Sequence, residues 1–345
     1  MHLKSDKIPI FRVSAELIDG SDAAISATEM QDIVTEVLPP FLRERFANEH
    51  QADFSLAFDD IGRFRVNAFL SSGTCTMVLR HVKSKIPSFE DLHLPPIMRD
   101  LALSPRGIIL AAGTTGSGKS TTLAAMINHI NCNTRRRIIT IEDPIEYVFT
   151  DIQSVISQRE VGLDTMTFHG ALKAVLRQDP DVIMIGEMRD SESFMAALAA
   201  AETGHLVLST IHTGNAAQAV PRILDFFPSS ERDQLRMALA DNMRAVFCQR
   251  LIPSIKGGVR PAIEIMINTP TIRKLIEKNL LEKLPAGIET GREDGMQTFN
   301  QAIYKLIKGC EISEDQGTRF ASNVEALRMN LKGIFLDEAN RIIST

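Results

Sequence analysis

The chain has 345 residues, of which 44% are hydrophobic and 23% charged, and its formal net charge is −5. This composition is that of a globular protein with room for two domains, and its acidic balance argues against nucleic acid as the main ligand. The sequence contains no run of about 18 apolar residues that could span a membrane. Its first residues also lack the apolar segment of a signal peptide, so we expect a cytoplasmic location.

Cysteines and basic residues give no sign of a zinc or nucleic-acid site. The four cysteines lie far apart, without C-x-x-C spacing or the pattern of a disulfide framework, so we expect reduced thiols and no bound zinc. The basic run Arg135–Arg137 is short and has no interleaved aromatic residues. We interpret it as a solvated turn rather than a nucleic-acid contact, and we expect no nucleic-acid partner.

Residues 1–90 predict a small, mostly antiparallel α/β domain. The expected helix covers Thr28–Phe46, where apolar residues recur at helical spacing. The expected strands, of which the second and third form a hairpin around Asp59–Gly62, are Ile8–Val13, Asp53–Phe58, Arg63–Phe69 and Thr74–Val82. Alternation along the hairpin places Arg63 and Arg65 on the face opposite to the core. The inward side chains are expected to be Phe54, Leu56, Phe58, Phe64, Val66 and Ala68.

A proline-rich stretch from Lys83 to Arg106 predicts the connection between two domains. We expect this stretch to be interrupted by a short helix around Ile97–Ala102. The sequence therefore predicts an N-terminal domain at 1–90, a linker at 91–106 and a larger domain at 107–345.

The larger domain opens with a buried strand, Gly107–Ala112, and a glycine-rich loop. From Gly113 the sequence reads G-T-T-G-S-G-K-S-T, which fits the phosphate-loop pattern G-x-x-x-x-G-K-[S/T]. The glycines let backbone N–H groups face phosphate oxygens, Lys119 adds charge at the β- and γ-phosphates, and Ser120 is a candidate Mg²⁺ ligand. A plain turn would explain the glycines but not Lys119 followed by Ser120. The expected phosphate-site residues are Gly113, Thr114, Thr115, Gly116, Ser117, Gly118, Lys119, Ser120 and Thr121.

Three further apolar strands are predicted at Ile138–Ile141, Val182–Ile185 and Leu206–Ile211, separated by helical sequence. This order is typical of parallel βαβ units with right-handed crossovers, so the fold class is α/β. Each of these strands is followed by polar residues. Because ligands of open parallel sheets lie at the carboxyl ends of the strands, we expect the polar clusters to meet at the phosphate loop.

Carboxylates in two of these clusters are candidates for catalysis. Glu187 directly follows a strand, where it could activate water for attack on a γ-phosphate, although a helix N-terminal acid would give the same pattern. The preceding Gly186 stands where many phosphate-loop enzymes carry Asp, so Mg²⁺ would depend on Ser120, water and the remaining acids. Those acids, which could hold Mg²⁺, orient water or form a solvated loop, are Glu142, Asp143 and Glu146.

Basic residues flank the same strands. His205 and His212 bracket the last of them, so they lie on opposite faces or at opposite ends. His212, at the carboxyl end beside Thr213, is the candidate for sensing the γ-phosphate, whereas His205 fits packing as well as function. Arg189 follows Glu187 closely and is expected to orient it or to pair with an acid. Two histidines at this spacing do not make a zinc site without further ligands.

Beyond about residue 221 the sequence predicts a mostly helical region that serves as structure and interaction surface. An edge strand is expected at Arg260–Ile267, and a helix is expected over Pro228–Arg250. The apolar face of that helix would include Leu235, Leu239, Met243 and Phe247. The helices expected in the C-terminal region, about 269–345, are Thr269–Leu281, Met296–Gly309, Ser313–Ala321 and Asn323–Ile343.

Several stretches of the chain match the motifs of one family. They are F-R-V-N-A-F, G-T-T-G-S-G-K-S-T-T, I-T-I-E-D-P-I-E-Y, Q-R-E-V-G, D-P-D-V-I-M-I-G-E-M-R-D, A-A-E-T-G-H-L-V, T-I-H-T and G-M-Q-T-F-N-Q. On these motifs the chain resembles type IV pilus retraction ATPases of the PilT/PilU kind, within the secretion ATPase superfamily. The resemblance implies a PAS-like N-terminal domain, a RecA-like ATPase domain with a helical C-terminal tail, and hydrolysis of ATP with Mg²⁺ that drives pilus retraction.

The resemblance also implies partners and residue roles. It implies a homohexameric ring, peripheral to the inner face of the cytoplasmic membrane, that contacts an inner-membrane platform protein and acts on the pilin machinery indirectly. The roles assigned by motif are a phosphate-loop pair at Lys119 and Ser120, an acidic box at Glu142 and Glu146, a base at Glu187, a histidine box at His205 and His212, and phosphate-contacting arginines at Arg65 and Arg80. Thr271–Ile276 matches the retraction-specific motif only in part. An assembly ATPase and a nucleotide-gated scaffold with little turnover therefore stay open as alternatives.

Overall fold

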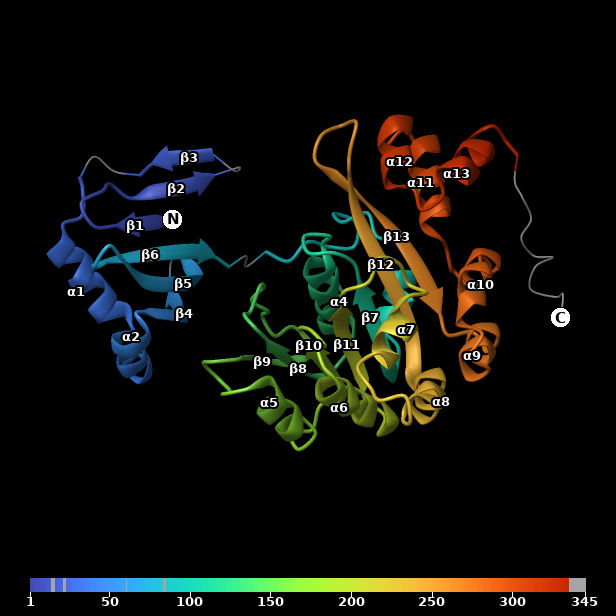
Figure 1. The fold of residues 1–345 in the computed structure, drawn as a ribbon, viewed down its shortest axis with the longest axis horizontal. Helices are drawn as coiled ribbons and strands as arrows, with labels where there is room; N and C mark the ends of the chain where they lie inside the picture. Colours follow the sequence, from blue (N-terminus) through green and yellow to red (C-terminus); the bar gives the residue numbers. More distant parts are fainter. Residues whose placement is uncertain (14–15, 21–22, 60, 83–84, 335–345) are drawn as a thin grey trace. The chain divides into compact units, whose positions relative to one another are not determined.

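Figure 1 shows the computed structural model, which describes residues 1–13, 16–20, 23–59, 61–82 and 85–334. The chain divides into two compact units, one formed by Met1–Lys85 with Pro144–Val148 and the other by Ile86–Asp143 with Phe149–Thr345. Both units combine sheet and helix, so the predicted α/β class is confirmed. The predicted features that fall in part outside the described residues are the hairpin turn at Asp60, the proline-rich stretch at 83–84 and the last helix at 335–343.

The N-terminal unit contains an antiparallel sheet of six strands in the order β3-β2-β1-β6-β5-β4 (Figure 1). The strands are β1 His2–Lys4, β2 Ile10–Val13, β3 Glu16–Asp19, β4 Gln51–Phe58, β5 Gly62–Ser71 and β6 Thr74–His81. The predicted hairpin is present as β4 and β5, and β6 continues the antiparallel pairing. The short strands β1 and β3 were not predicted, because three or four residues carry too little periodicity to be recognised.

The predicted continuous helix over Thr28–Phe46 is wrong because prolines interrupt it. The first helix, α1 (Ala27–Val37), ends shortly before Pro39 and Pro40. A proline cannot donate a helical hydrogen bond, and its ring disfavours helical angles in the residue before it. A 3-10 turn at Pro40–Leu42 therefore separates α1 from the second helix, α2 (Arg43–Glu49).

The hairpin of β4 and β5 buries its predicted inward face over only part of its length. Phe54, Val66 and Ala68 are buried, and Leu56 and Phe64 are half-buried. Phe58 is 44% exposed, so its predicted place in the core is wrong. The reason is that the two strands continue toward their turn past the buried part of the sheet.

The larger unit is built on a seven-stranded sheet in the order β13-β12-β7-β11-β10-β8-β9. Six strands are parallel and β13 is an antiparallel edge strand, which confirms the predicted βαβ organisation and the predicted edge strand. The strands are β7 Gly107–Ala112, β8 Arg137–Glu142, β9 Val155–Glu160, β10 Val182–Ile185, β11 Leu206–Ile211, β12 Met243–Pro253 and β13 Val259–Ile267. Every residue of β7, β10 and β11 is buried, as expected for central parallel strands.

Helices connect these strands and continue beyond them (Figure 1). They are α3 Ile97–Ala102, α4 Lys119–Asn133, α5 Phe168–Val175, α6 Ser191–Glu202, α7 Ala219–Leu224, α8 Arg232–Asn242, α9 Pro270–Glu277, α10 Leu284–Thr290, α11 Phe299–Lys308, α12 Glu314–Phe320 and α13 Val324–Leu331. The helix expected within the proline-rich stretch is present as α3, and three of the expected C-terminal helices are present as α9, α11 and α12. The fourth, predicted over Asn323–Ile343, ends as α13 at Leu331, since Gly333 has a φ of +83°, and the predicted part at 335–343 lies outside the described residues. The helix α10, which contains Pro285 and Gly287, was not predicted. Among the described residues, no helix has the length and hydropathy needed to cross a membrane.

The predicted helix over Pro228–Arg250 is wrong in its second half. α8 ends at Asn242, and the following residues form β12, which pairs with β7 on one side and β13 on the other. Apolar residues recur in this stretch at helical spacing, but the pairing with two strands outweighs that periodicity. Met243 and Phe247 are consequently buried as strand residues.

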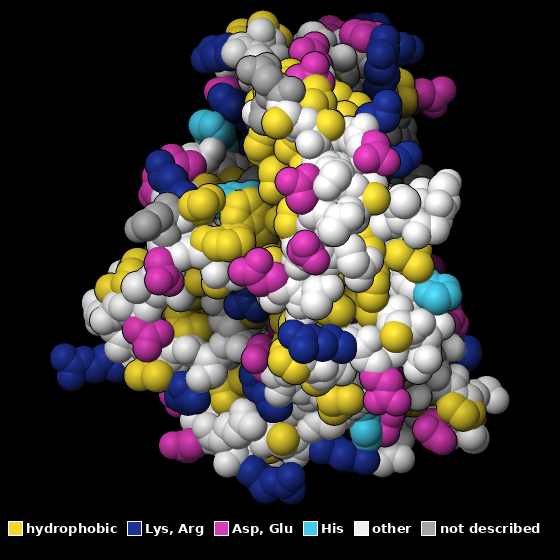
Figure 2. Space-filling view, turned by 90° about the vertical axis from the view of Figure 1, so that its left-hand side faces the viewer, with side chains coloured by type: hydrophobic (Ala, Val, Ile, Leu, Met, Phe, Trp, Pro, Cys, Tyr) yellow, Lys and Arg dark blue, Asp and Glu magenta, His cyan; other side chains and the backbone are white. Residues whose placement is uncertain are grey.

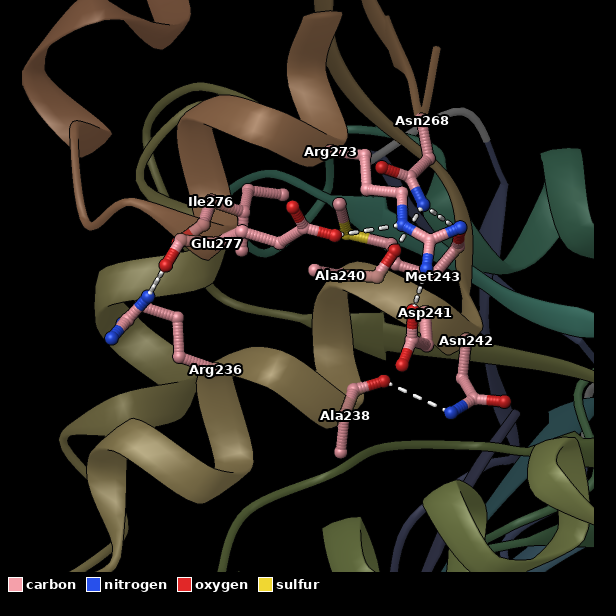
Figure 3. A network of polar contacts seen from close by, with 10 residues as sticks. All are labelled: Arg236, Ala238, Ala240, Asp241, Asn242, Met243, Asn268, Arg273, Ile276 and Glu277. Carbon is pink, nitrogen blue, oxygen red and sulfur yellow. Dashed lines mark hydrogen bonds and ion pairs between the residues drawn. The ribbon is translucent and has the colours of Figure 1, made fainter. Parts of the chain in front are cut away.

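Side-chain contacts fix the end of α8 (Figure 3). The Asn268 amide donates to the carbonyl oxygens of Ala240 and Met243, at 2.8 and 2.7 Å, and so satisfies acceptors at the helix end. Arg273 of α9 pairs with Asp241, in the last turn of α8. We call Asn268, Arg273 and Asp241 the α8–α9 clamp, because they hold the point at which the chain leaves α8 and enters β12.

Figure 2 shows one face of the molecule in space-filling form. Lys and Arg side chains are interspersed there with Asp, Glu and hydrophobic side chains. This mixture of charges is in keeping with the small formal net charge of −5.

Candidate active site

The phosphate loop directly follows β7, and its backbone requires glycine at two places. Gly113 and Gly118 have φ angles of +139° and +91°, which residues with a side chain rarely adopt. A Cβ atom on Gly113 would lie 2.5 Å from Ser117 Oγ, and one on Gly118 would lie 2.7 Å from Gln249 Nε2. The loop therefore has the tight backbone that lets N–H groups approach phosphate oxygens closely.

Lys119 and Ser117 give this loop a polar interior. Lys119 opens α4, is 7% exposed, and donates hydrogen bonds to the carbonyl oxygens of Gly113 (2.9 Å) and Thr114 (3.0 Å). Ser117 Oγ is buried and, within the described part of the chain, has no hydrogen-bond partner. A positive charge beside a buried hydroxyl fits an anionic ligand rich in oxygen atoms, such as a nucleoside triphosphate.

The other predicted loop residues complete the same turn. Thr114, Thr115 and Gly116 are exposed at its tip. Ser120 and Thr121 lie in the first turn of α4, where the helix presents its positive end. The predicted role of the Ser120 hydroxyl as a ligand of Mg²⁺ stays a prediction.

Gln249 of β12 lies at the phosphate loop but was not predicted as a site residue. Its Oε1 accepts a hydrogen bond from Thr122 Oγ1 of α4 at 2.8 Å. Its carbonyl oxygen and its side-chain amide also lie against Gly113 and Gly118, respectively. The signal was hidden because Gln249 belongs to the stretch whose periodicity predicts a helix. As part of a strand beside β7, it supports the phosphate loop from one side.

Glu187, which follows β10, is the centre of a charged cluster. Arg189 donates a hydrogen bond to Glu187 Oε2 at 2.8 Å, and His212 Nε2 lies 3.4 Å from Glu187 Oε1. The hydrogen bond from Arg189 is the main cause that lowers the pKa of Glu187. Burial acts in the opposite direction, and the charges of His212 and Lys119 lower the pKa further. The structure therefore brings Glu187, Arg189 and His212 together within the electric field of the phosphate loop.

Glu142, the last residue of β8, is held in place by two donors. Thr140 Oγ1 and Gln158 Nε2 donate hydrogen bonds to Glu142 Oε1 at 2.7 and 3.1 Å, and the residue is buried. Its partner on the neighbouring strand β9 is Glu160, a second buried carboxylate that the sequence analysis does not single out. Two acids thus end adjacent parallel strands on the side of the sheet where the phosphate loop lies.

The chain is crowded where β10 ends. A Cβ atom on Gly186 would lie 3.3 Å from the carbonyl oxygen of Ile141, so there is little room for the Asp that many phosphate-loop enzymes carry here. The pKa of Arg189 is raised mainly by its hydrogen bond to Glu187 and by the charge of that carboxylate, and the charge of Asp143 adds a smaller effect in the same direction. Asp143 therefore belongs to the electrostatic surroundings of the Glu187 cluster.

His205 lies at the opposite end of the sheet. Its Nδ1 is 2.8 Å from the carbonyl oxygen of Ala200 and 3.0 Å from Thr203 Oγ1. Its neighbour Leu206 pairs with Gly107 at the start of β7, whereas the phosphate loop follows the end of β7. Within one chain, His205 is thus separated from the loop by the length of a strand, and its predicted contact with nucleotide stays a prediction.

Three predicted site residues belong to the N-terminal unit. Arg65 of β5 and Arg80 of β6 are direct cross-strand partners, so their side chains share one face of that sheet. Arg65 also lies 3.9 Å from Asp53 of β4. Glu146 lies in Pro144–Val148, which groups with this unit. The predicted contacts of these three residues with nucleotide stay predictions.

The larger unit has the features of a nucleotide-hydrolysing domain. A parallel sheet presents a phosphate loop, an ionised glutamate, an arginine and a histidine at its strand ends, which defines a phosphate-loop ATPase. The chain belongs to the family described as "Type II/IV secretion system protein", which matches residues 40–317.

Three relatives with high coverage of the chain are named as pilus or twitching motility proteins. The type IV pilus ATPase PilU of Pseudomonas aeruginosa is 42% identical over 94% of this chain and 85% of its own length. A twitching motility protein of Neisseria gonorrhoeae is 42% identical over 92% of this chain and 86% of its own. The type IV pilus retraction ATPase PilT of P. aeruginosa is 38% identical over 91% of this chain and 92% of its own.

Solved structures agree with this placement. The pilus retraction motor PilT with bound ADP matches with a TM-score of 0.88 and 40% identity, over 94% of this chain and 93% of that one. The ATPase DotB of Legionella pneumophila matches with a TM-score of 0.74 and 26% identity, over 92% and 90%. These matches extend over both units, so the chain is an ATPase of this family with the family's two-part fold.

Proposed function

We propose that this ATPase is the motor of type IV pilus retraction, which uses ATP hydrolysis to remove pilin subunits from the pilus base. The observation that carries the proposal is the cluster of Glu187, Arg189 and His212 at the phosphate loop. It occurs in a chain with three relatives, at 38% to 42% identity, that are named for the pilus, its retraction or twitching motility. The site supports hydrolysis, and the relatives support retraction as its use.

The phosphate loop binds ATP through charge and backbone N–H groups. Lys119 supplies positive charge at the β- and γ-phosphates, and the start of α4 adds the positive end of its helix dipole. Mg²⁺ bound at the Ser120 hydroxyl would neutralise charge on the phosphate oxygens. Glu142 and Glu146 are the acidic residues that we assign to holding that ion through water or to orienting water.

Glu187 is the residue that we assign as the base. It orients a water molecule for attack on the γ-phosphate and accepts the proton that the water releases. The lowered pKa of Glu187 keeps the carboxylate ionised at neutral pH, and the hydrogen bond from Arg189 fixes its direction. We assign His212, 3.4 Å from the carboxylate, the role of sensing the γ-phosphate and its loss.

We further propose that Arg65 and Arg80 contribute positive charge to the transferred phosphate. Charge from a mobile arginine stabilises the transition state of phosphoryl transfer. Like charges directly opposite each other across two strands are destabilising, so a purely structural role would not favour this pair. His205 is assigned to nucleotide binding by its motif alone.

The working unit that we propose is a homohexameric ring, peripheral to the inner face of the cytoplasmic membrane. A single phosphate-loop domain leaves one side of its nucleotide open, and head-to-tail contacts that close into a ring cover that side. An inner-membrane platform protein would transmit the movement to the pilin machinery. No step of this scheme involves nucleic acid.

Purified protein tests the enzymatic part of the proposal. Lys119→Ala should abolish Mg²⁺-dependent ATP hydrolysis, because it removes the positive charge that holds the β- and γ-phosphates. Glu187→Gln should bind ATP with little change and lower turnover by roughly 10² to 10⁴-fold, since the geometry remains but the base is lost. Lys173→Ala, an exposed position on α5, is the control. An active Glu187→Gln enzyme would instead favour Glu142 as the base.

The direction of force is tested in the source bacterium. Cells without this protein should carry more surface pili and should fail to withdraw fluorescently labelled pili. Wild-type protein should restore withdrawal and Lys119→Ala should not. Fewer pili in the cells without the protein would indicate an assembly ATPase. Pili that withdraw normally with Lys119→Ala would indicate a scaffold that needs no turnover.

A further inference from the structure

One side chain of β12 connects the loop after β11 with the C-terminal helices. Arg250 donates a hydrogen bond to the carbonyl oxygen of Gly214 at 3.1 Å. It also donates to the carbonyl oxygen of Phe320 at 2.5 Å and to the hydroxyl of Ser322 at 3.2 Å. Its guanidinium carbon lies 3.7 Å from the centre of the Phe299 ring. The same planar group therefore contacts the loop on one side and the ends of α11 and α12 on the other.

The loop in question, residues 213–216, directly follows His212 and is fastened at further points. We call it the histidine loop. The thiol of Cys248 donates to the carbonyl oxygen of Thr213 at 3.6 Å, and the Ala216 N–H donates to the Glu264 carboxylate at 3.3 Å. Side chains from β12 and β13 thus hold the backbone of this loop. Because His212 immediately precedes it, the position of the loop determines where the imidazole lies.

Strand alternation lets β12 contact the active site from two sides. Side chains of successive strand residues point to opposite faces of the sheet. Gln249 accepts a hydrogen bond from Thr122, at the phosphate loop. The next residue, Arg250, points to the histidine loop and the C-terminal helices. One strand therefore joins the phosphate loop, the histidine loop and the C-terminal helices.

Packing alone would not require a guanidinium at this position. Arg250 is half-buried, and burial lowers its pKa, because taking a positive charge out of water costs free energy. An apolar side chain of similar length would fill the same space at less cost. An apolar side chain could not donate hydrogen bonds to the acceptors on the loop and on the helices. The guanidinium reaches both with one rigid, planar group.

We propose that Arg250 is a positioning residue that couples the C-terminal helices to the pair of His212 and Glu187. A movement of α11 or α12 against β12 would move the guanidinium and, with it, the Gly214 carbonyl. That movement changes the distance between His212 and Glu187, which is 3.4 Å here. The C-terminal helices thereby set the rate of turnover without contacting the nucleotide. The inference rests on the proposed roles of His212 and Glu187 in hydrolysis.

Arg250→Gln and a matched control separate coupling from packing. The control is Arg260→Gln, because Arg260 of β13 also connects the sheet to the helical region, through Glu311 at 2.6 Å, but does not touch the histidine loop. We expect Arg250→Gln to lower kcat at least about tenfold while KM for ATP changes less than about threefold. Arg250→Lys should recover only part of the rate. The kcat of Arg260→Gln should stay within about twofold of the wild-type value, even if its melting temperature falls as much as that of Arg250→Gln.

A second variant keeps the inference testable if Arg250→Gln does not fold. Phe299→Leu removes the ring face against which the guanidinium lies but leaves the nucleotide site intact. It should lower kcat on its own. Where Arg250→Gln also folds, the two effects should not add, because both variants break the same connection. Unchanged kcat in Phe299→Leu, or equal losses in Arg250→Gln and Arg260→Gln, would overturn the inference. A wild-type protein without ATPase activity would instead defeat the proposed function.

Discussion

At the scale of single residues, Arg189 controls the protonation of Glu187. Its hydrogen bond is the main cause that lowers the pKa of the carboxyl, and only the ionised form can accept a proton from water. In Arg189→Ala the pKa of Glu187 should therefore rise. The acidic limb of the pH profile of kcat should move to higher pH, so that activity is lost earlier as the pH falls.

Steady-state ATPase rates measured from about pH 3.5 to 8 test this shift, because the ordinary pKa of a glutamate is about 4.3 and that of Glu187 is lowered. Arg319→Ala is a suitable control, because Arg319 forms an exposed pair with Asp315 on α12. A lower rate with an unmoved acidic limb would mean that Arg189 acts on the phosphate and not on the base.

Glu264 of β13 makes stability depend on pH. Burial is the main cause that raises its pKa from 4.5 to about 7. The folded state then binds more protons than the unfolded state between these two values, so this group's contribution to the free energy of unfolding falls as the pH rises through that window. Glu264→Gln keeps an acceptor for the Ala216 N–H and removes the charge. The free energy of unfolding of Glu264→Gln, measured relative to that of wild type, should rise by on the order of 3 kcal/mol from pH 5 to pH 8.

Urea unfolding at several pH values measures this difference. The exposed Glu202→Gln serves as the control and should follow wild type across the range. A difference between Glu264→Gln and wild type that stays constant with pH would show that Glu264 does not titrate in this window.

At the scale of secondary structure, the α8–α9 clamp predicts unequal effects of its members. Asn268→Ala removes the side-chain donor to the carbonyl oxygens of Ala240 and Met243. The free energy of unfolding should therefore fall by about 1 to 3 kcal/mol. Arg273→Ala breaks two ion pairs, with Asp241 and with Glu277. Their side chains are partly exposed, so the free energy of unfolding should fall by less than about 1 kcal/mol. Thermal unfolding compares the two variants. A larger loss in Arg273→Ala would show that Arg273, rather than the amide, holds the end of α8.

Local sequence predicts an element well when its own residues determine its structure. The β7 strand, the phosphate loop and the start of α4 were predicted correctly because the glycine pattern and the apolar run on either side are local signals. The stretch Met243–Arg250 was predicted wrongly because its strand conformation depends on pairing with β7 and β13, which are distant in sequence. Periodicity within the stretch could not reveal those partners.

The same distinction applies to the site. Glu187, Arg189 and His212 were predicted to meet because they follow parallel strands, and the structure brings them together. Gln249 and Arg250 were missed because their importance comes from β12 lying beside the phosphate loop and the histidine loop. His205 is the opposite case. Its motif predicted it as a site residue, but it lies directly before β11, at the end of the sheet opposite to the phosphate loop.

At the scale of the whole molecule, the proposal requires the N-terminal domain to respond to the state of the nucleotide. Arg65 and Arg80 are neighbours on one face of its sheet, and they carry the positive charge that we assign to the transferred phosphate. An arginine that contacts the γ-phosphate before hydrolysis loses that contact afterwards. The phosphate would then bias the arrangement of the two domains and convert hydrolysis into movement.

Arg80→Ala is the change that tests this coupling. Turnover should fall at least about a hundredfold, which corresponds to roughly 2.7 kcal/mol of transition-state stabilisation, because the developing charge on the γ-phosphate loses a partner. Affinity for ADP should stay nearly unchanged, since ADP lacks that phosphate. Arg65→Ala should act in the same direction but more weakly, and Arg45→Ala, in an exposed pair with Glu49 on α2, should have no effect.

A mixing experiment then shows whose nucleotide the arginine serves. Arg80→Ala and Lys119→Ala proteins are each expected to be inactive alone. If the arginine acts on the nucleotide of a neighbouring subunit, mixed rings regain activity, because an Lys119→Ala subunit can lend its intact Arg80 to a neighbour with an intact phosphate loop. If it acts within its own subunit, mixing restores nothing, since no subunit then has both groups. Arg80→Ala protein with a near-normal rate would remove the N-terminal domain from the chemistry, and movement would have to arise within the ATPase unit alone.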